Sequence, residues 1–147
     1  MTVTHDPCPP LIKDCPMGFL FGLFGKKNGP VETYHSNGQL ESRGVMRDGV
    51  LHGPYEWYYA NAQLREKGTY KDGEKHGLLK TYHSSGQLQA KCSFKDGLPH
   101  GHSEIFDENG QPMVRGNWNM HKECGEWFEY GETVIYDPCP PGLEDGN

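Results

Sequence analysis

Three histidines recur at equal spacing in this chain of 147 residues. His52, His76 and His100 are 24 residues apart, and each follows an Asp-Gly pair by three residues. Histidine is the commonest metal ligand and an acid or base near neutral pH. Equivalent residues of successive β-hairpins are roughly 9–10 Å apart, whereas every ligand of a zinc ion lies within about 2.1 Å of it. We therefore expect these histidines to close glycine-rich turns, and we predict no metal site and no cofactor.

Other patterns typical of catalysis are missing from the sequence. It contains no paired nucleophile and base, no pair of acids at a predicted cleft and no phosphate-binding glycine loop. We therefore predict that the protein is not an enzyme and has no small-molecule substrate.

The cysteines leave several alternatives open. Two Asp-Pro-Cys-Pro-Pro segments, 6–10 and 137–141, lie near the two ends of the sequence. Cys8, Cys15 and Cys139 could bind zinc with His5, form a disulfide between the two arms, or lie in the extended tails that proline favours. Because five cysteines are an odd number without a dense framework, and the first residues do not look like a secretory signal, we expect reduced thiols and a cytoplasmic protein.

A repeat of 24 residues must position all of these side chains. Turn residues recur twice in each unit and bracket segments of six to eight residues, the length of a β-strand. The sequence predicts an all-β protein, an elongated antiparallel meander of about ten strands built from stacked β-hairpin units. Each unit carries an aromatic residue at one position: Tyr34, Tyr58, Tyr82, Phe106 and Tyr130.

Alternation within the units predicts one packed face and one solvated face. On the packed side the units read Leu, a variable residue, Gly, and then a large residue, as in Leu64, Glu66, Gly68 and Tyr70. The glycine leaves room for a tyrosine ring of a neighbouring unit, so we assign the aromatic column that includes Tyr58 to the core. Because Val, Ile, Leu and Phe make up less than a fifth of the chain, aromatic rings must supply much of that core.

These patterns divide the chain into three parts. Residues 1–29 form a Pro/Cys arm with an apolar segment, 30–136 form the repeat array, and 137–147 form a proline-rich tail. The apolar run Met17–Phe24 is expected to cap one end of the array or, alternatively, to lie at a membrane interface, because it is too short to span a bilayer. Trp127 to Tyr136 is expected to close the other end.

One candidate partner-binding surface is aromatic. Tyr55, Trp57 and Tyr59 share one side of a predicted strand, opposite Tyr58. An exposed cluster of this composition is typical of a protein-binding hot spot. Cover by the N-terminal arm would explain the cluster equally well.

The second candidate surface is basic and lies on the solvated face. Its cations would form a stripe about 30 Å long that could meet phosphates, anionic lipids or an acidic protein. Alternatively, the neighbouring Glu32, Glu56 and Glu104 pair with these cations and the stripe serves only solubility. The candidate binding residues on this side are Arg43, Arg65, Lys67, Lys91 and Arg115.

The repeat itself resembles a known family. Tyr34 to Leu40 reads Tyr-x3-Gly-Gln-Leu, and Asp48 to Gly53 reads Asp-Gly-x2-His-Gly. This pattern, repeated over 58–77 and 82–101 and weaker over 106–125, resembles the MORN-repeat variant of bacterial antitoxin-like or immunity-like proteins.

The resemblance implies a non-enzymatic protein that binds and neutralises a cognate protein toxin. Related MORN arrays serve as scaffolds or membrane-surface modules, which gives the alternative function. A third possibility is sugar binding through Trp57 and Trp127. The net charge of −6 argues against a nucleic-acid partner.

Overall fold

Two kinds of turn alternate along the chain and fold it into hairpins. A computed structural model describes residues 28–143, which contain strands and turns but no helix. Asp48 and Gly49 have φ values of 51° and 83°, as the two-residue turn of a tight hairpin requires. At the other end of the hairpin, the amide of His35 donates to the carbonyl of Gln39 at 2.8 Å and closes a five-residue loop.

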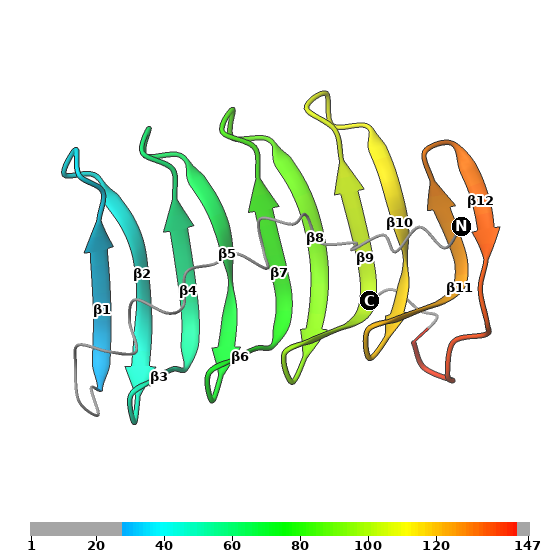
Figure 1. Cartoon of the computed structure of the whole chain (residues 1–147), viewed down its shortest axis with the longest axis horizontal. Coiled ribbons are helices and arrows are strands. Elements are labelled where there is room, and N and C mark those ends of the chain that lie inside the picture. Colours follow the sequence, from blue (N-terminus) through cyan, green and yellow to red (C-terminus); the bar gives the residue numbers. More distant parts are fainter. Residues whose placement is uncertain (1–27, 144–147) are drawn as a thin grey trace.

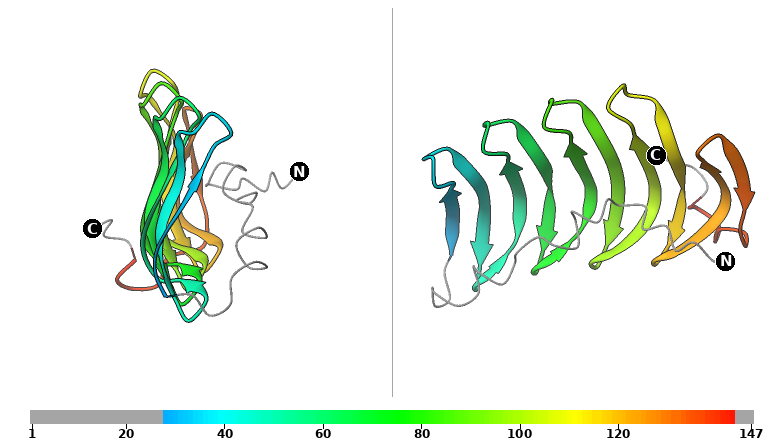
Figure 2. Two further views of the ribbon diagram at one scale, coloured as in Figure 1. Left: turned by 90° about the vertical axis from the view of Figure 1, so that its left-hand side faces the viewer. Right: turned by 45° about the horizontal axis from the view of Figure 1, so that its top comes forward.

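The strands form one antiparallel sheet, so the predicted all-β meander is confirmed (Figure 1). Neighbours along the sheet follow the order β1-β2-β4-β5-β7-β8-β9-β10-β11-β12, while β3 pairs with β2 and β6 pairs with β5. Seen from its end, the sheet is a single bowed layer (Figure 2). The strands are β1 (Gly29–Tyr34), β2 (Leu40–Arg47), β3 (Val50–Leu51), β4 (Gly53–Tyr58), β5 (Leu64–Lys71), β6 (Glu74–Lys75), β7 (Gly77–Tyr82), β8 (Leu88–Lys95), β9 (Leu98–Phe106), β10 (Pro112–Asn119), β11 (Lys122–Glu129) and β12 (Glu132–Ile135).

One face of the sheet is packed, as alternation predicted. Met46, Tyr70, Phe94 and Trp118 occupy one position of the repeat, and all four are buried. Two clusters form along this face, one centred on β4 to β8 and one on β10 and β11. The core is therefore a line of side chains that passes from unit to unit, as in other repeat proteins.

Aromatic rings on this face lie over glycines. A Cβ atom added at Gly68 would come within 3.0 Å of Cε1 of Tyr55, and one added at Gly116 would come within 2.1 Å of Cδ2 of Trp127. The glycines are thus part of the packing, because each leaves the space that a ring of an adjacent strand fills.

Cys92 occupies the same repeat position as these glycines. It is fully buried, and its direct partners on the two neighbouring strands are Leu79 and Ser103. Both are smaller than the Tyr55 or Trp127 ring. The larger residue in the glycine column is therefore balanced by smaller neighbours.

The assignment of the Tyr58 column to the core is wrong. Trp57 lies directly opposite Ser42 and Glu66 on the packed face, so the next residue, Tyr58, points to the other face. There its hydroxyl donates to the carboxylate of Glu56 at 2.8 Å. The aromatic residue that recurs every 24 residues at the Tyr58 position is therefore not a core residue, although its repetition is strict.

At the lower edge of the sheet, where β3 and β6 lie in Figure 1, two histidines accept hydrogen bonds from the following unit. The amide of Asp72 donates to Nδ1 of His52 at 3.1 Å, and the amide of Met120 donates to Nδ1 of His100 at 3.3 Å. His76 lies beside the next turn as well, with Nδ1 3.8 Å from the Asp96 carboxylate. These contacts support the turn-closing role expected for the histidine column.

At the upper edge, side chains reach the backbone of the following unit in the same direction. Nδ2 of Asn37 donates to the carbonyl of Ala60 at 2.9 Å, and the hydroxyl of Tyr59 donates to the carbonyl of Tyr82 at 2.9 Å. Nε2 of His35 lies 2.9 Å from the carbonyl of Tyr58. Both edges therefore supply contacts between units, in addition to the strand pairing.

The C-terminal end is closed by aromatic rings and a disulfide. Trp118, Trp127 and Tyr136 pack in successive edge-to-face contacts, as expected for an aromatic close. Cys139 forms a disulfide with Cys124, which corrects the expectation of reduced thiols at this position. Cys8, Cys15 and the apolar run Met17–Phe24 lie outside the described residues.

Candidate partner-binding face

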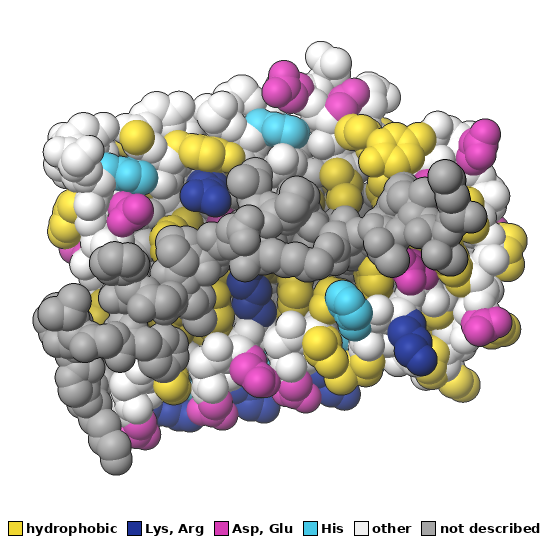
Figure 3. Space-filling model, viewed as in Figure 1, with side chains coloured by type: hydrophobic (Ala, Val, Ile, Leu, Met, Phe, Trp, Pro, Cys, Tyr) yellow, Lys and Arg dark blue, Asp and Glu magenta, His cyan; other side chains and the backbone are white. Residues whose placement is uncertain are grey.

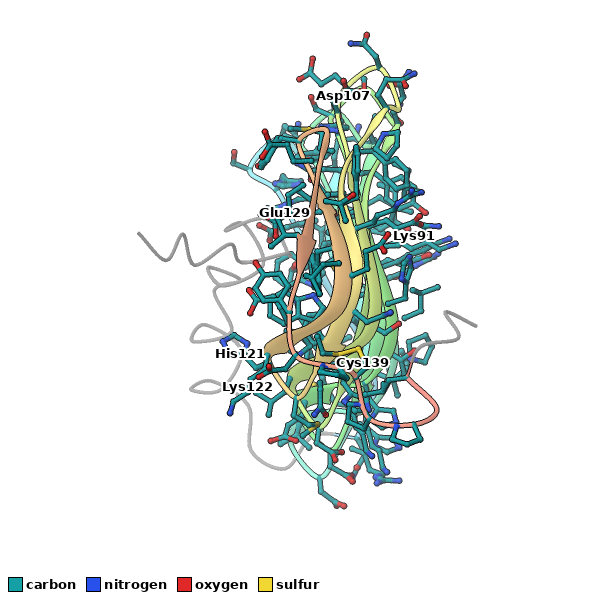
Figure 4. All side chains as sticks on the ribbon, turned by 90° about the vertical axis from the view of Figure 1, so that its right-hand side faces the viewer. Lys91, Asp107, His121, Lys122, Glu129 and Cys139 are labelled. Carbon is teal, nitrogen blue, oxygen red and sulfur yellow. A yellow bond between two sulfur atoms is a disulfide. The ribbon has the colours of Figure 1, made fainter. Side chains whose placement is uncertain are left out.

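A row of directly opposed residues crosses the sheet on the face away from the core. Neighbouring strands are about 4.8 Å apart, so each side chain of this ionic row is within reach of the next. Figure 4 shows Lys91 on this face, whereas Glu129 and His121 lie on the other side of the sheet. From β1 to β11 the ionic row reads Glu32, Arg43, Glu56, Lys67, Lys80, Lys91, Glu104, Arg115 and Phe128.

The two ends of the row alternate in charge, and each end contains one ion pair. The guanidinium of Arg43 donates to the carboxylate of Glu56, and this hydrogen bond holds the pKa of Glu56 below its ordinary value. Burial and the same carboxylate raise the pKa of Tyr58. Nζ of Lys91 lies 2.5 Å from Oε2 of Glu104. Burial acts to raise the pKa of Glu104, but Lys91 and His102 together outweigh it and the pKa is lowered.

Lys80 breaks the alternation. Lys67 lies directly opposite Lys80, and Lys80 lies directly opposite Lys91. Three other units carry glutamate at the Lys80 position, namely Glu32, Glu56 and Glu104. Within residues 28–143, Lys67 and Lys80 form no ion pair. Like charges placed opposite each other destabilise a sheet, so the fold gives no reason for this lysine.

A groove of about 610 Å³ follows the first part of the ionic row, from β1 to β7. Besides charged side chains of the row, it is lined by apolar residues of the parallel row below, where Pro30 lies opposite Val45 and Pro54 lies opposite Thr69. Leu78, at the far end, is 50% exposed. Apolar walls beside a few fixed charges are typical of surfaces that bind other molecules specifically.

Further cations lie at the lower edge. Nη2 of Arg47 donates to the carboxylate of Asp72 at 2.7 Å, and this contact lowers the pKa of Asp72. Figure 3, which views the packed face, shows basic and acidic side chains alternating along this edge. Arg47 is thus paired with a carboxylate, unlike Lys80 at the centre of the ionic row.

The four cations predicted as a stripe do share one face, but their surroundings differ. The guanidinium of Arg43 lies 6.0 Å from the ring of Tyr58, and that of Arg115 lies 5.4 Å from the ring of Phe128. Arg43 and Lys91 are neutralised by glutamates, so much of the stripe carries no net charge.

The predicted exposed aromatic patch is absent from the described surface. Tyr55 and Trp57 are 3% and 9% exposed and belong to the core. Tyr59 lies apart from them in the upper loop, with the guanidinium of Arg65 5.8 Å from its ring. The structure therefore does not bring Tyr55, Trp57 and Tyr59 together as a binding surface.

The prediction missed two charged residues. Lys80 was detectable, because it departs from the glutamate of the other units. Glu66 is only 4% exposed on the packed face, where it accepts a hydrogen bond from the hydroxyl of Tyr55 and lies 3.1 Å from Nζ of Lys75. Nothing in the sequence pattern marks that buried pair.

Neither a metal site nor a membrane span is found in the described part of the chain. No three His, Cys, Asp or Glu side chains within residues 28–143 are grouped closely enough to hold a metal ion. The same residues contain no helix able to cross a membrane.

Comparison with known proteins identifies the repeat. No curated protein matches the chain. A crystal structure of accessory secretory protein 1, 2 and 3 of Streptococcus pneumoniae is similar over 65% of this chain but 18% of that chain, at 12% identity and a TM-score of 0.37, which is too distant to carry an argument. The model of the MORN repeat variant matches residues 27–48, 51–72, 75–96 and 99–120, more than half of the chain. The chain therefore belongs to the MORN repeat variant family, whose repeats often mediate binding.

Proposed function

We propose that the chain is a non-enzymatic protein-binding module and that the face crossed by the ionic row docks the partner. The observation that carries this proposal is that Lys67 and Lys80 lie directly opposite each other, form no ion pair within residues 28–143 and line a groove with apolar walls. This arrangement lowers the stability of the sheet, so it is best explained by a bound partner that supplies the missing opposite charge.

A protein surface fits this face better than a membrane. Anionic lipids attract each nearby Lys or Arg by about 1 kcal/mol without regard to its arrangement. Here Arg43 and Lys91 are neutralised by glutamates, and the whole chain carries a net charge of −6. A protein partner, in contrast, can match fixed charges and apolar walls at the same time.

An unbiased selection tests this proposal. Random peptides displayed on phage are selected against the full chain, and hydrogen exchange then locates the bound peptides. Binders that protect amides of β4, β5 and β7 and compete with one another would support the docking face. Repeated failure to select any binder, or protection confined to other strands, would contradict it.

The family resemblance supports a finer proposal, in which the partner is a toxin that the chain neutralises by direct binding. The product of the adjacent reading frame is expressed alone and together with this chain. Growth arrest that this chain relieves, with co-purification of the two proteins, is the expected result. A harmless neighbour, or rescue without binding, would count against the toxin while leaving the docking face untouched.

A further inference from the structure

We infer that Lys67 and Lys80 bind the carboxylates of a short acidic segment of the partner, which lies extended along the groove. This inference rests on the proposed function and specifies its ligand. Lys67 is exposed, Lys80 is half-buried, and both line the groove. Because they lie on adjacent strands about 4.8 Å apart, two carboxylates on the same side of the extended peptide, from residues i and i+2, can pair with both.

The stretch of consecutive lysines in the ionic row is short, and a glutamate lies at each end of it. Three lysines follow one another across β5, β7 and β8, and the next residues of the row on either side are Glu56 and Glu104. A long polyanion or an anionic membrane laid along the row would meet ion pairs without net charge beyond Lys67 and Lys80, so most of its charges would find no partner there. A segment with two or three acidic residues matches this stretch in length as well as in sign.

The walls of the groove indicate what accompanies the acidic residues. Pro54 and Leu78 lie two residues along their strands from the ionic row and therefore on the same face. Val45 is 37% exposed in the same groove. Apolar side chains next to the acidic pair would be buried against these residues, which adds affinity that charge alone does not supply.

Lys80→Glu separates this binding role from a structural one. The substitution restores the charge alternation of the other units, since a glutamate would lie between Lys67 and Lys91. We expect a higher melting temperature together with a loss of binding. If Lys80 instead stabilised the fold, the Lys80→Glu variant would have a lower melting temperature than the unaltered chain.

The probe is a fluorescein-labelled peptide with glutamates at two alternate positions, i and i+2, flanked by leucines, and it is titrated into the full chain at fixed salt. We expect Lys80→Glu to weaken its binding at least about tenfold, because two attractive charge contacts become repulsive or are lost. The matched control is Lys95→Glu, the same change at an exposed lysine near the lower edge. It should alter binding less than about threefold.

Three results would overturn the inference. One is an equal loss of binding in Lys95→Glu, which would mean that net charge alone is sensed. Another is equal binding of a peptide with glutamines in place of glutamates. The third is tighter binding to phosphatidylserine vesicles than to the peptide, with the same dependence on Lys80. If the phage selection gives binders on this face that are not acidic, this inference fails while the proposed function stands, and if it gives none, the function itself fails.

Discussion

Trp127 lies against Gly116 so closely that a Cβ atom on the glycine would be 2.1 Å from Cδ2 of the indole. The corresponding Cβ atom on Gly68 would be 3.0 Å from Cε1 of Tyr55. The contact at Gly116 involves the fused centre of a ring that is 1% exposed, whereas the contact at Gly68 involves the outer part of a tyrosine. The two sites therefore differ in how easily they adjust.

This difference gives a graded prediction for two alanine substitutions. Gly116→Ala should lower the free energy of unfolding by about 3 kcal/mol or more, and Gly68→Ala by about 1 kcal/mol, since overpacking is costly where the neighbour cannot move. Urea denaturation of both variants measures the losses. Equal losses at the two sites would contradict this account of the packing.

Ala62 occupies a left-handed backbone position, with φ of 66°, where the other upper loops have Gly38, Gly86 and Gly110. Ala62→Gly should therefore stabilise the protein by about 1 kcal/mol, because an L-residue is strained in this region. Gly38→Ala is the matched control and should cost a similar amount. No atom lies within 4 Å of the Cβ position at Gly38, so that effect is one of backbone alone. Thermal unfolding that moves both variants in one direction would contradict the prediction.

Trp57 is a core residue, and its removal should act on stability. Trp57→Ala is expected to cost about 3–5 kcal/mol, as for other buried aromatic residues. Arg65→Ala, on the following strand and partly exposed, should change stability by less than about 0.5 kcal/mol. Circular dichroism during heating measures both. A fully stable Trp57→Ala variant would show that the indole is not part of the core.

The disulfide between Cys124 and Cys139 closes a segment of 15 residues. Cys139→Ser should destabilise the last unit by about 3 kcal/mol, and dithiothreitol should have the same effect on the unaltered chain. Because each repeat contacts chiefly its neighbours, hydrogen exchange should quicken in β11 and β12 but not in β4 and β5. A uniform increase along the sheet would contradict this local effect.

The hydrogen bond from Arg43 lowers the pKa of Glu56 in the folded protein. The ionised carboxylate therefore adds stability above its unfolded pKa of about 4.3, and this contribution is lost as the pH falls through the lower folded value. Glu56→Gln should be less stable than the unaltered chain at pH 7, and the difference should vanish in acid. Glu108→Gln, at an exposed loop site, should show no such change with pH. A difference that persists in acid would exclude this linkage.

The repeat spacing was sufficient to predict the antiparallel sheet and the packed face of strands such as β5, but not the packed face of β4. It did not identify the aromatic column of the core, because Tyr58 recurs as regularly as a core residue does. Trp57 lies opposite Ser42, and this pairing places Tyr58 on the face away from the core. The pairing depends on how many residues lie in the turns between neighbouring strands. The candidate site was half predictable, since the basic register was visible, but the neutralisation of Arg43 and Lys91 depends on which glutamates lie opposite them.

Within residues 28–143, the side-chain-to-backbone hydrogen bonds that join successive units at the two edges all run in the same direction. His52 receives the amide of Asp72, and Asn37 donates to the carbonyl of Ala60. In each case the side chain comes from the earlier unit and the backbone group from the later one. The array therefore has a polarity. Shortening it from the N-terminal side leaves backbone groups such as the Asp72 amide without their side-chain partners. Shortening it from the other side instead leaves side chains such as Asn37, and carbonyls such as that of Leu51, without the later unit that they contact. During synthesis, each new hairpin emerges beside a completed unit that already holds the groups it needs.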